Sequence, residues 1–252
     1  MNEASPQRVA LVTGGAVRVG RVISLHLAEA GYDVVVAYRS SAEAAEALAA
    51  ELRAMGRRCE LVQADLADPD GAEAVVGAAR SGFGRLDVLV NSASSFEPAR
   101  LLDVDARAWD EVMAVNARAP HLTVRAAADL LREARGAVVN IVDLSAFQPW
   151  TGFPHHAVSK AALAHLTRIQ ARALAPHVRV NAVAPGAVLR PEGWSPERWE
   201  AVAERAPLQR AGTPDDVATA VRYLAEAPFV TGQVLAVDGG RSLGTLDARD
   251  ED

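Results

Sequence analysis

The segment RVALVTGGAVRVG, residues 8–20, runs from an apolar stretch into a glycine-rich turn, and the helix-like segment RVISLHLAEAG, residues 21–31, follows it. In a unit of strand, turn and helix, glycines let the backbone approach a pyrophosphate, and the first N–H groups of the helix point at it. A tight turn that binds no ligand also needs glycine. The glycine motif indicates a ligand site only because it stands at the start of a longer alternation of strand-like and helix-like segments. The natural ligand of such a unit is a dinucleotide.

Short apolar runs alternate with segments of helical periodicity along the rest of the chain. The Ala- and Glu-rich segments 42–56 and 110–131 carry apolar residues at spacings of three and four, which predicts helices. The apolar runs are nearly continuous in Val, Leu and Ala, which is typical of strands buried on both faces. The pattern predicts a Rossmann-type α/β fold, a doubly wound parallel sheet of about seven strands with helices on both faces. The predicted strands are residues 8–13, 33–38, 59–64, 86–91, 137–142, 178–184 and 233–238.

Length and composition limit the classes of protein that the chain can belong to. Its 252 residues, half of them hydrophobic, predict one domain over 1–252 with short flexible tails at 1–7 and 245–252. No apolar run reaches about 18 residues and the first residues do not resemble a signal peptide, so we expect a cytoplasmic protein without a membrane partner. The net charge of -6, without a basic stripe, argues against nucleic acid and favours a small-molecule substrate. The single cysteine, Cys59, is expected to be a buried thiol, and no metal site is predicted.

The end of the second predicted strand carries Tyr38-Arg39-Ser40-Ser41. An NAD site usually has Asp or Glu here, which holds the ribose 2'-hydroxyl. A guanidinium and neighbouring hydroxyls suit a 2'-phosphate instead, because arginine offers a planar fork of donors. We therefore expect NADPH as the cofactor; the alternative is that Arg39 is only a solvated charge at the start of the next helix.

The chain resembles the short-chain dehydrogenase/reductase family over nearly its whole length. The resemblance implies that Asp65 and Leu66 contact the adenine, that Asn91 lines the cofactor groove, that Lys160 holds the nicotinamide ribose and that Asn116 belongs to a water-linked proton relay. The motifs that carry it, in chain order, are the Thr13 to Gly20 loop, Asp65-Leu66, Asn91-Ser92-Ala93, Asn116, Lys160, Pro185-Gly186 and Asp238-Gly239-Gly240.

The same resemblance predicts the full cofactor site and an assembly. Members of the family usually form tetramers through two long helices and the C-terminal strand, here residues 229–240, so a homotetramer with two-fold axes is expected. The residues expected to bind the cofactor are Thr13, Gly14, Arg18, Val19, Gly20, Tyr38, Arg39, Ser40, Asp65, Leu66, Asn91, Ala93, Lys160, Pro185 and Gly186.

Three departures from the usual family pattern are similar to the branch of pteridine reductases and bacterial dihydropteridine reductases. Arg18 stands where a glycine is usual, Ser94-Ser95-Phe96 follows Asn91-Ser92-Ala93, and Asp143 takes the position of the catalytic serine. By this resemblance, Phe96 would stack on one face of a pterin, and Ser94 and Arg18 would contact the pterin and the cofactor phosphates. Taken singly, Phe96 could be ordinary packing and Arg18 a surface charge.

A histidine replaces the catalytic tyrosine of the family pattern. That tyrosine lies four residues before the lysine and thirteen after the Ser or Asp, and counting from Lys160 gives His156 and then Asp143 without a gap. A histidine can act as a general acid near neutral pH only as imidazolium. The charge of Lys160 opposes this form and that of Asp143 favours it, and the pattern leaves the balance between the two open.

The loss of the tyrosine favours reduction of a C=N bond over reduction of a ketone. A ketone needs a proton on oxygen, which the tyrosine normally supplies, whereas reduction of the C=N bond of a dihydropterin protonates a nitrogen. The first hypothesis is thus an NADPH-dependent reductase of a dihydropterin, dihydrofolate or another flat heterocycle, with the proton routed through Asp143, a bound water or His156. The alternatives are a catalytically silent NADPH-binding protein and, less favoured, a carbonyl or 3-oxoacyl-carrier reductase. The expected catalytic residues are Asp143, His156, Lys160 and Asn116, and the expected substrate contacts are Arg18, Ser94, Phe96, Asp143 and His156.

Overall fold

All of the apolar runs become strands of one parallel sheet, and its central strands are buried on both faces. The computed structural model describes residues 7–191 and 193–244, so the predicted tails lie outside the described residues except for Gln7. Within that range the sheet has seven strands in the order β3-β2-β1-β4-β5-β6-β7, which confirms the predicted fold class. The strands are β1 (Val9–Thr13), β2 (Asp33–Tyr38), β3 (Cys59–Gln63), β4 (Val88–Asn91), β5 (Ala137–Ile141), β6 (Arg179–Pro185) and β7 (Val234–Val237).

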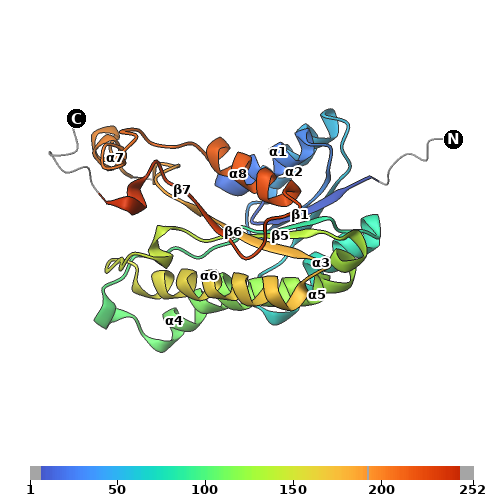
Figure 1. Cartoon of the computed structure of the whole chain (residues 1–252), viewed down its shortest axis with the longest axis horizontal. Helices are drawn as coiled ribbons and strands as arrows, with labels where there is room; N and C mark the ends of the chain where they lie inside the picture. Colours follow the sequence, from blue (N-terminus) through green and yellow to red (C-terminus); the bar gives the residue numbers. More distant parts are fainter. Residues whose placement is uncertain (1–6, 192, 245–252) are drawn as a thin grey trace.

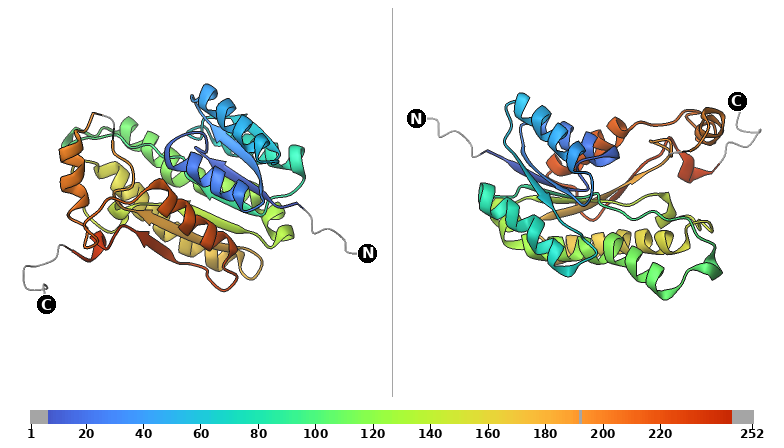
Figure 2. Two further views of the ribbon diagram at one scale, coloured as in Figure 1. Left: turned by 90° about the horizontal axis from the view of Figure 1, so that it is seen from above. Right: turned by 180° about the vertical axis from the view of Figure 1, so that it is seen from behind.

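Helices cover the sheet in two layers (Figure 1). On one side lie α1 (Arg18–Glu29), α2 (Ala42–Ala54) and α8 (Pro214–Glu226). On the other side lie α3 (Pro69–Phe83), α4 (Ala106–Met113), α5 (Ala119–Ala134) and α6 (Pro154–Leu174). The views of Figure 2 show α7 (Pro196–Ala203) beyond one end of the sheet, apart from both layers. Among the helices of the described residues, none is long and apolar enough to cross a membrane.

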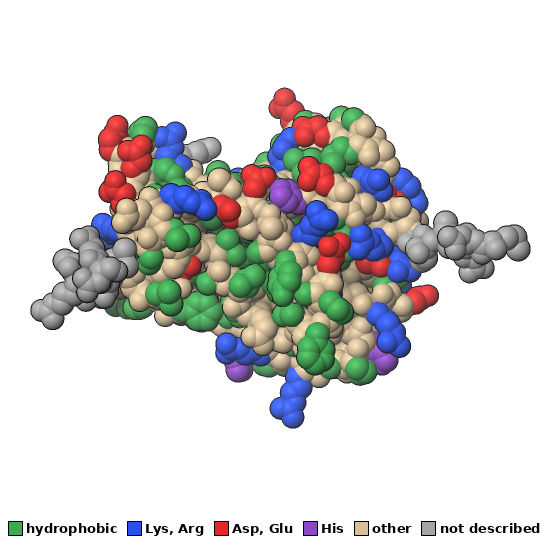
Figure 3. All heavy atoms as spheres, turned by 45° about the horizontal axis from the view of Figure 1, so that its top comes forward, with side chains coloured by type: hydrophobic (Ala, Val, Ile, Leu, Met, Phe, Trp, Pro, Cys, Tyr) green, Lys and Arg blue, Asp and Glu red, His purple; other side chains and the backbone are tan. Residues whose placement is uncertain are grey.

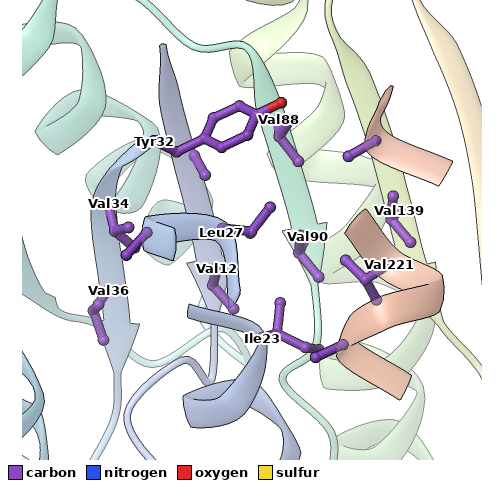
Figure 4. Close-up of a cluster of buried hydrophobic side chains, with 14 of the residues drawn as sticks. Val12, Ile23, Leu27, Tyr32, Val34, Val36, Val88, Val90, Val139 and Val221 are labelled. Atoms are coloured by element: carbon purple, nitrogen blue, oxygen red, sulfur yellow. The ribbon is translucent and has the colours of Figure 1, made fainter. Parts of the chain in front are cut away.

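Alternate side chains of each strand enter the two layers of core. Figure 4 shows Val12, Val34 and Val90 pointing toward α1, where Ile23 and Leu27 sit one helical turn apart. The intervening residues, such as Leu11 of β1, pack in a second core against α3 and α5. Because both faces are filled, polar groups from different strands can gather only at the two ends of the sheet.

The predicted helix over 110–131 is interrupted. It consists of α4, a π-helical turn over Ala114–Arg118 and α5. Such π turns are rare and often occur at functional sites. This one places Asn116 at the carboxyl end of the sheet, where the chain order reverses between β1 and β4 and ligands of doubly wound folds bind.

Candidate active site

An open cleft runs along the carboxyl ends of β1 to β4, at the reversal point of the sheet. The loops that follow these four strands form it, as expected for a dinucleotide site. It is lined by Gly14, Ala16, Val17, Ala37, Tyr38, Arg39, Ser40, Ser41, Ala64, Asp65, Leu66, Ala93, Ser94, Ser95, Phe96, Glu97 and Val115. Nine of the predicted cofactor and substrate residues are in this set, whereas none of the predicted catalytic residues is.

The glycine-rich turn is packed too closely for side chains at two positions. Gly14 has a φ of 62°, and a Cβ there would lie 3.0 Å from the Cα of Ala93. A Cβ on Gly20 would lie 2.1 Å from the carbonyl oxygen of Gly14. Thr13 accepts hydrogen bonds at Oγ1 from the backbone N–H groups of Ser92 and Ala93. These contacts join the turns after β1 and β4 into one wall of the cleft.

Arg18 adopts a φ of 54°, in the left-handed region that favours glycine. An L-residue there costs about 1–2 kcal/mol. This explains why glycine is usual at this position in the family pattern. Arg18 begins α1 directly after the lining residue Val17 but is not itself among the residues that line the cleft, so its contact with the cofactor or the substrate stays a prediction.

The other end of the cleft presents an exposed cation. Arg39 is exposed at the end of β2, and its backbone carbonyl accepts a hydrogen bond from Gln63. Within the described residues, the guanidinium of Arg39 forms no ion pair with an acidic side chain. It is therefore available for an anionic ligand in the cleft.

Asn91 does not present its side chain to the cleft, contrary to the prediction. It is buried in β4, where its amide donates to Asn140 and its carbonyl accepts from Thr123. Asn140 in turn donates to Thr167 of α6. The side chains form a buried polar chain that joins two strands and two helices, because an amide inside an apolar strand needs hydrogen-bond partners. Asn91 thus has a structural role, and its neighbour Ala93 lines the cleft instead.

Pro185 and Gly186 lie at the end of β6 and outside the lining of the cleft. The N–H of Gly186 donates to the carbonyl of Val237, and a Cβ on Gly186 would lie 2.7 Å from the Cα of Asp238. The glycine is required for the close approach of the segments after β6 and β7.

Asn116 joins the loop after β4 to α6. It is completely buried, and its Oδ1 accepts from the backbone N–H of Ser95 and from the hydroxyl of Ser94. Its Nδ2 donates to the carbonyl of Ser95 at 2.9 Å and to Ser159 Oγ at 3.0 Å. All the hydrogen-bonding capacity of this amide is used, and the π turn exists where these bonds are made.

His156 and Asp143 are in direct contact. Nε2 of His156, in the first turn of α6, lies 2.6 Å from Oδ2 of Asp143, which follows β5. Nδ1 of His156 lies 3.0 Å from the carbonyl oxygen of Ser95. The other carboxylate oxygen of Asp143 accepts from the backbone N–H and the hydroxyl of Ser145. The structure therefore brings together the two residues whose thirteen-residue spacing had indicated a catalytic pair.

Two charged groups of the site have shifted pKa values. Burial lowers the pKa of Lys160, against the effect of the Asp143 charge, and its Nζ donates to the carbonyl of Ile141 at 2.8 Å. Burial alone would raise the pKa of Asp143, but the hydrogen bond from His156 and the charge of Lys160 outweigh it, so this pKa is below its ordinary value. Asp143 is accordingly a carboxylate at neutral pH.

Phe96 lies between the cleft and His156. Its ring stacks on Phe153 with centroids 4.2 Å apart and meets the His156 ring edge-on at 4.7 Å. Phe96 is still 46% exposed and lines the cleft. Phe153, the residue before α6, was not predicted as part of the site. The pair forms an aromatic wall that covers His156, and the exposed part of Phe96 faces the cleft.

Comparison with known proteins identifies the family. The family model described as Enoyl-(Acyl carrier protein) reductase matches residues 15–242. An uncharacterised oxidoreductase of Mycobacterium tuberculosis is 39% identical over 248 residues, which cover 95% of this chain and 94% of that protein. The 3-oxoacyl-[acyl-carrier-protein] reductase FabG of Staphylococcus aureus is 37% identical over 237 residues, with 92% and 96% covered.

A solved structure shows the same architecture with a ligand. FolM alternative dihydrofolate reductase 1 from Brucella suis, in complex with NADP, superposes with a TM-score of 0.89 at 35% identity and covers 96% of this chain and 98% of its own. The chain belongs to the short-chain dehydrogenase/reductase family and is an NAD(P)-dependent oxidoreductase.

Lys160 is the only lysine in the chain, which makes its titration measurable in isolation. With 13C-labelled lysine, NMR should show one side-chain signal that titrates below the ordinary lysine pKa, because burial disfavours the ammonium. Asp143→Asn should lower this pKa further, since the carboxylate charge raises it. Between the folded and unfolded pKa values the unfolded chain binds more protons, so the free energy of unfolding should increase with pH in that window. A titration at or above the ordinary value would contradict the burial of the ammonium.

Proposed function

We propose that this oxidoreductase is an NADPH-dependent reductase that transfers hydride to the carbon of a C=N bond in a pterin or similar flat heterocycle, such as a dihydropterin or dihydrofolate. The observation that carries the proposal is the Asp143 carboxylate bonded to His156 behind Phe96, at the place where the family pattern has a tyrosine. The likeness to a FolM alternative dihydrofolate reductase supports it.

The residues of the cleft fit NADPH. Gly14 lines the cleft in the glycine-rich turn before α1, where backbone N–H groups suit a pyrophosphate, and the exposed Arg39 and Ser40 suit a 2'-phosphate. Asp65 and Leu66 line the cleft, where they would contact the adenine, and Lys160, bonded to the Ile141 carbonyl, would hold the nicotinamide ribose. Bound NADPH supplies the hydride, and the protein residues hold it, orient the substrate and supply a proton.

The proton chemistry favours nitrogen over oxygen as the acceptor. The three tyrosines of the chain are Tyr32, Tyr38 and Tyr223, so none occupies the family's catalytic position. A ketone oxygen needs an acid beside it as negative charge develops, whereas an imine nitrogen is basic enough to take a proton from a less closely placed acid. Asp143 is the group of the His156–Asp143 pair nearer to solvent, with 18% of its side chain exposed against 2% for His156.

A second candidate is a 3-oxoacyl-carrier reductase, which the likeness to FabG favours. The catalytically silent NADPH-binding protein is a third, favoured by the aromatic wall over His156. The retained Asn116 bonds and the buried Lys160 argue against a silent protein, because burying them costs free energy that pure binding would not require.

Parallel assays of NADPH oxidation separate these candidates. We expect turnover with dihydrobiopterin or dihydrofolate and at least about 100-fold slower reduction of a 3-oxoacyl thioester, the size of a missing general acid. His156→Tyr should restore ketone reduction, because a phenol would again lie one helical turn from Lys160. Faster reduction of the thioester by the natural chain would favour the second candidate. No oxidation with any substrate, together with activity in His156→Tyr, would establish the silent protein.

Cofactor preference tests the role of Arg39. We expect Arg39→Ala to weaken NADPH binding by about 10- to 100-fold, the size of a charge-assisted hydrogen bond, and to leave NADH binding nearly unchanged. Titration of both cofactors by fluorescence measures this. Arg132→Ala is the matched control, since this exposed arginine is in the last turn of α5, at the opposite end of the sheet. Equal loss of both cofactors, or none, would rule out a 2'-phosphate contact.

We also propose a homotetramer with two kinds of interface. Figure 3 shows hydrophobic side chains exposed on one face of the molecule. Leu235 of β7 and Phe229, in the segment before β7, are among the exposed apolar residues. On α6, Val158 and Ile169 are about half exposed. Apolar surface of this kind usually marks an interface, and two separate patches are what a tetramer with two-fold axes needs.

Light scattering should give the mass of a tetramer at micromolar concentration. Leu235→Glu and Ile169→Glu should each reduce it to a dimer, because each buries a charge in only one of the two interfaces. A monomeric natural chain would exclude this assembly.

A further inference from the structure

The hydrogen bonds around His156 determine where its protons lie. Ser159 donates its hydroxyl proton to the carbonyl of His156, so it must accept from Asn116. The second N–H of Asn116 goes to the carbonyl of Ser95, which leaves none for Nδ1 of His156, 3.3 Å away. Nδ1 therefore carries its own hydrogen, directed at the Ser95 carbonyl at 3.0 Å, because a carbonyl only accepts.

The other ring nitrogen also faces an acceptor. Nε2 lies 2.6 Å from Oδ2 of Asp143, and this carboxylate is ionised at neutral pH. A hydrogen on Nε2 satisfies both groups. The geometry thus suits hydrogens on both nitrogens, which would make His156 an imidazolium paired with a carboxylate.

Ser145 leaves Asp143 a single oxygen for proton exchange. Its backbone N–H, at 2.8 Å, and its hydroxyl both donate to Oδ1, which fills the two lone pairs of that atom. Oδ2 has one bond, to His156, and keeps one lone pair. Ser145 is itself buried, so water does not compete for Oδ1.

We propose that His156 and Asp143 act as one acid, in which His156 stores the proton, Oδ2 of Asp143 passes it to the substrate nitrogen, and Ser145 is the positioning residue for that oxygen. The inference rests on the proposed function and deepens it. Phe96 lines the cleft and meets the His156 ring edge-on, and Asp143 is the more exposed member of the pair, so we assign the contact with the substrate to Asp143.

The step balances with the hydride that bound NADPH supplies. As hydride adds to the carbon of the C=N bond, the π electrons of that bond take up a proton and form N–H. The proton leaves Nε2, whose N–H electrons stay on the ring, and moves to Oδ2. Rotation about the Cγ–Oδ2 bond turns it toward the substrate nitrogen. His156 ends neutral and Asp143 ionised, and a proton from solvent restores the pair after product release.

The neighbouring charges suit a proton that is stored and then released. Lys160 and His155 lie on the same helix as His156, Asp143 follows β5, and Glu97 follows β4 beside Phe96. The charge of Lys160 opposes the imidazolium, while Asp143 stabilises it. When the proton moves from Nε2 to Oδ2, Asp143 loses the negative charge that stabilised the imidazolium. His156 and Asp143 are then both neutral, which favours transfer of the proton to the substrate.

Steady-state kinetics with dihydrobiopterin, followed over a range of pH, test the pair. In the natural chain we expect kcat to fall as pH rises, because the acid loses its proton. His156→Phe should lower kcat by about 100-fold or more and abolish that fall, with NADPH binding retained as the test of folding. Asp143→Asn should be at least as damaging.

Ser145 supplies the positioning control. Ser145→Ala should lower kcat by about 10-fold with little change in KM and shift the alkaline fall, because Oδ1 loses one donor. Ser145→Thr keeps the hydroxyl, so it should keep the kcat of the natural chain and the same fall of kcat with rising pH. If the natural chain turns over dihydrobiopterin and His156→Phe keeps its rate and pH profile, the shared acid is refuted while the proposed function stands. No turnover by the natural chain, despite NADPH binding, overturns both.

Discussion

The burial of a parallel sheet on both faces is the constraint on which the rest of this molecule depends. Val12, Leu11 and their neighbours fill two layers of core, so the only place for converging polar groups is the edge where the strands end. The turn after β1, the loop after β4 and the start of α6 meet there. Thr13 fastens the turn after β1 to the loop after β4, and Asn116 fastens that loop to α6.

The replacement of a tyrosine by His156 changes the chemistry that a site at this end of the sheet can support. A tyrosine hydroxyl in the family pattern meets the substrate oxygen directly. Here the imidazole turns back to Asp143 and to the Ser95 carbonyl, and Phe96 covers it. In the proposed mechanism the proton therefore reaches the substrate through the Asp143 carboxylate. Such an arrangement favours a basic nitrogen acceptor over a carbonyl oxygen, which needs a donor in place as charge develops.

The sequence predicts the features that local patterns control. Continuous apolar runs become buried strands, and a spacing of four residues places Lys160 and His156 on one face of α6, whereas the offset of thirteen residues to Asp143 was taken from the family resemblance. The exposed Arg39 also lies in the cleft as its position after the second strand suggested. These predictions succeed because periodicity and register are properties of neighbouring residues.

Features that depend on tertiary contacts could not be predicted in this way. The π turn at Asn116 exists because four hydrogen bonds to other segments hold the amide, and nothing in residues 110–131 indicates them. The groove role of Asn91 was implied by the family resemblance, and its buried partners Asn140 and Thr123 are distant in sequence. The stacking of Phe153 on Phe96 likewise joins residues whose proximity only the fold creates.

The central claim is that His156 is held as an imidazolium between Asp143 and the Ser95 carbonyl. Its most direct test is 15N NMR of the protein labelled at its six histidines, with the His156 signals assigned from their loss in His156→Gln. At neutral pH both ring nitrogens of His156 should show the shifts of protonated nitrogen, and Asp143→Asn should remove one of the two protons. A ring with one unprotonated nitrogen in the natural chain would contradict the account.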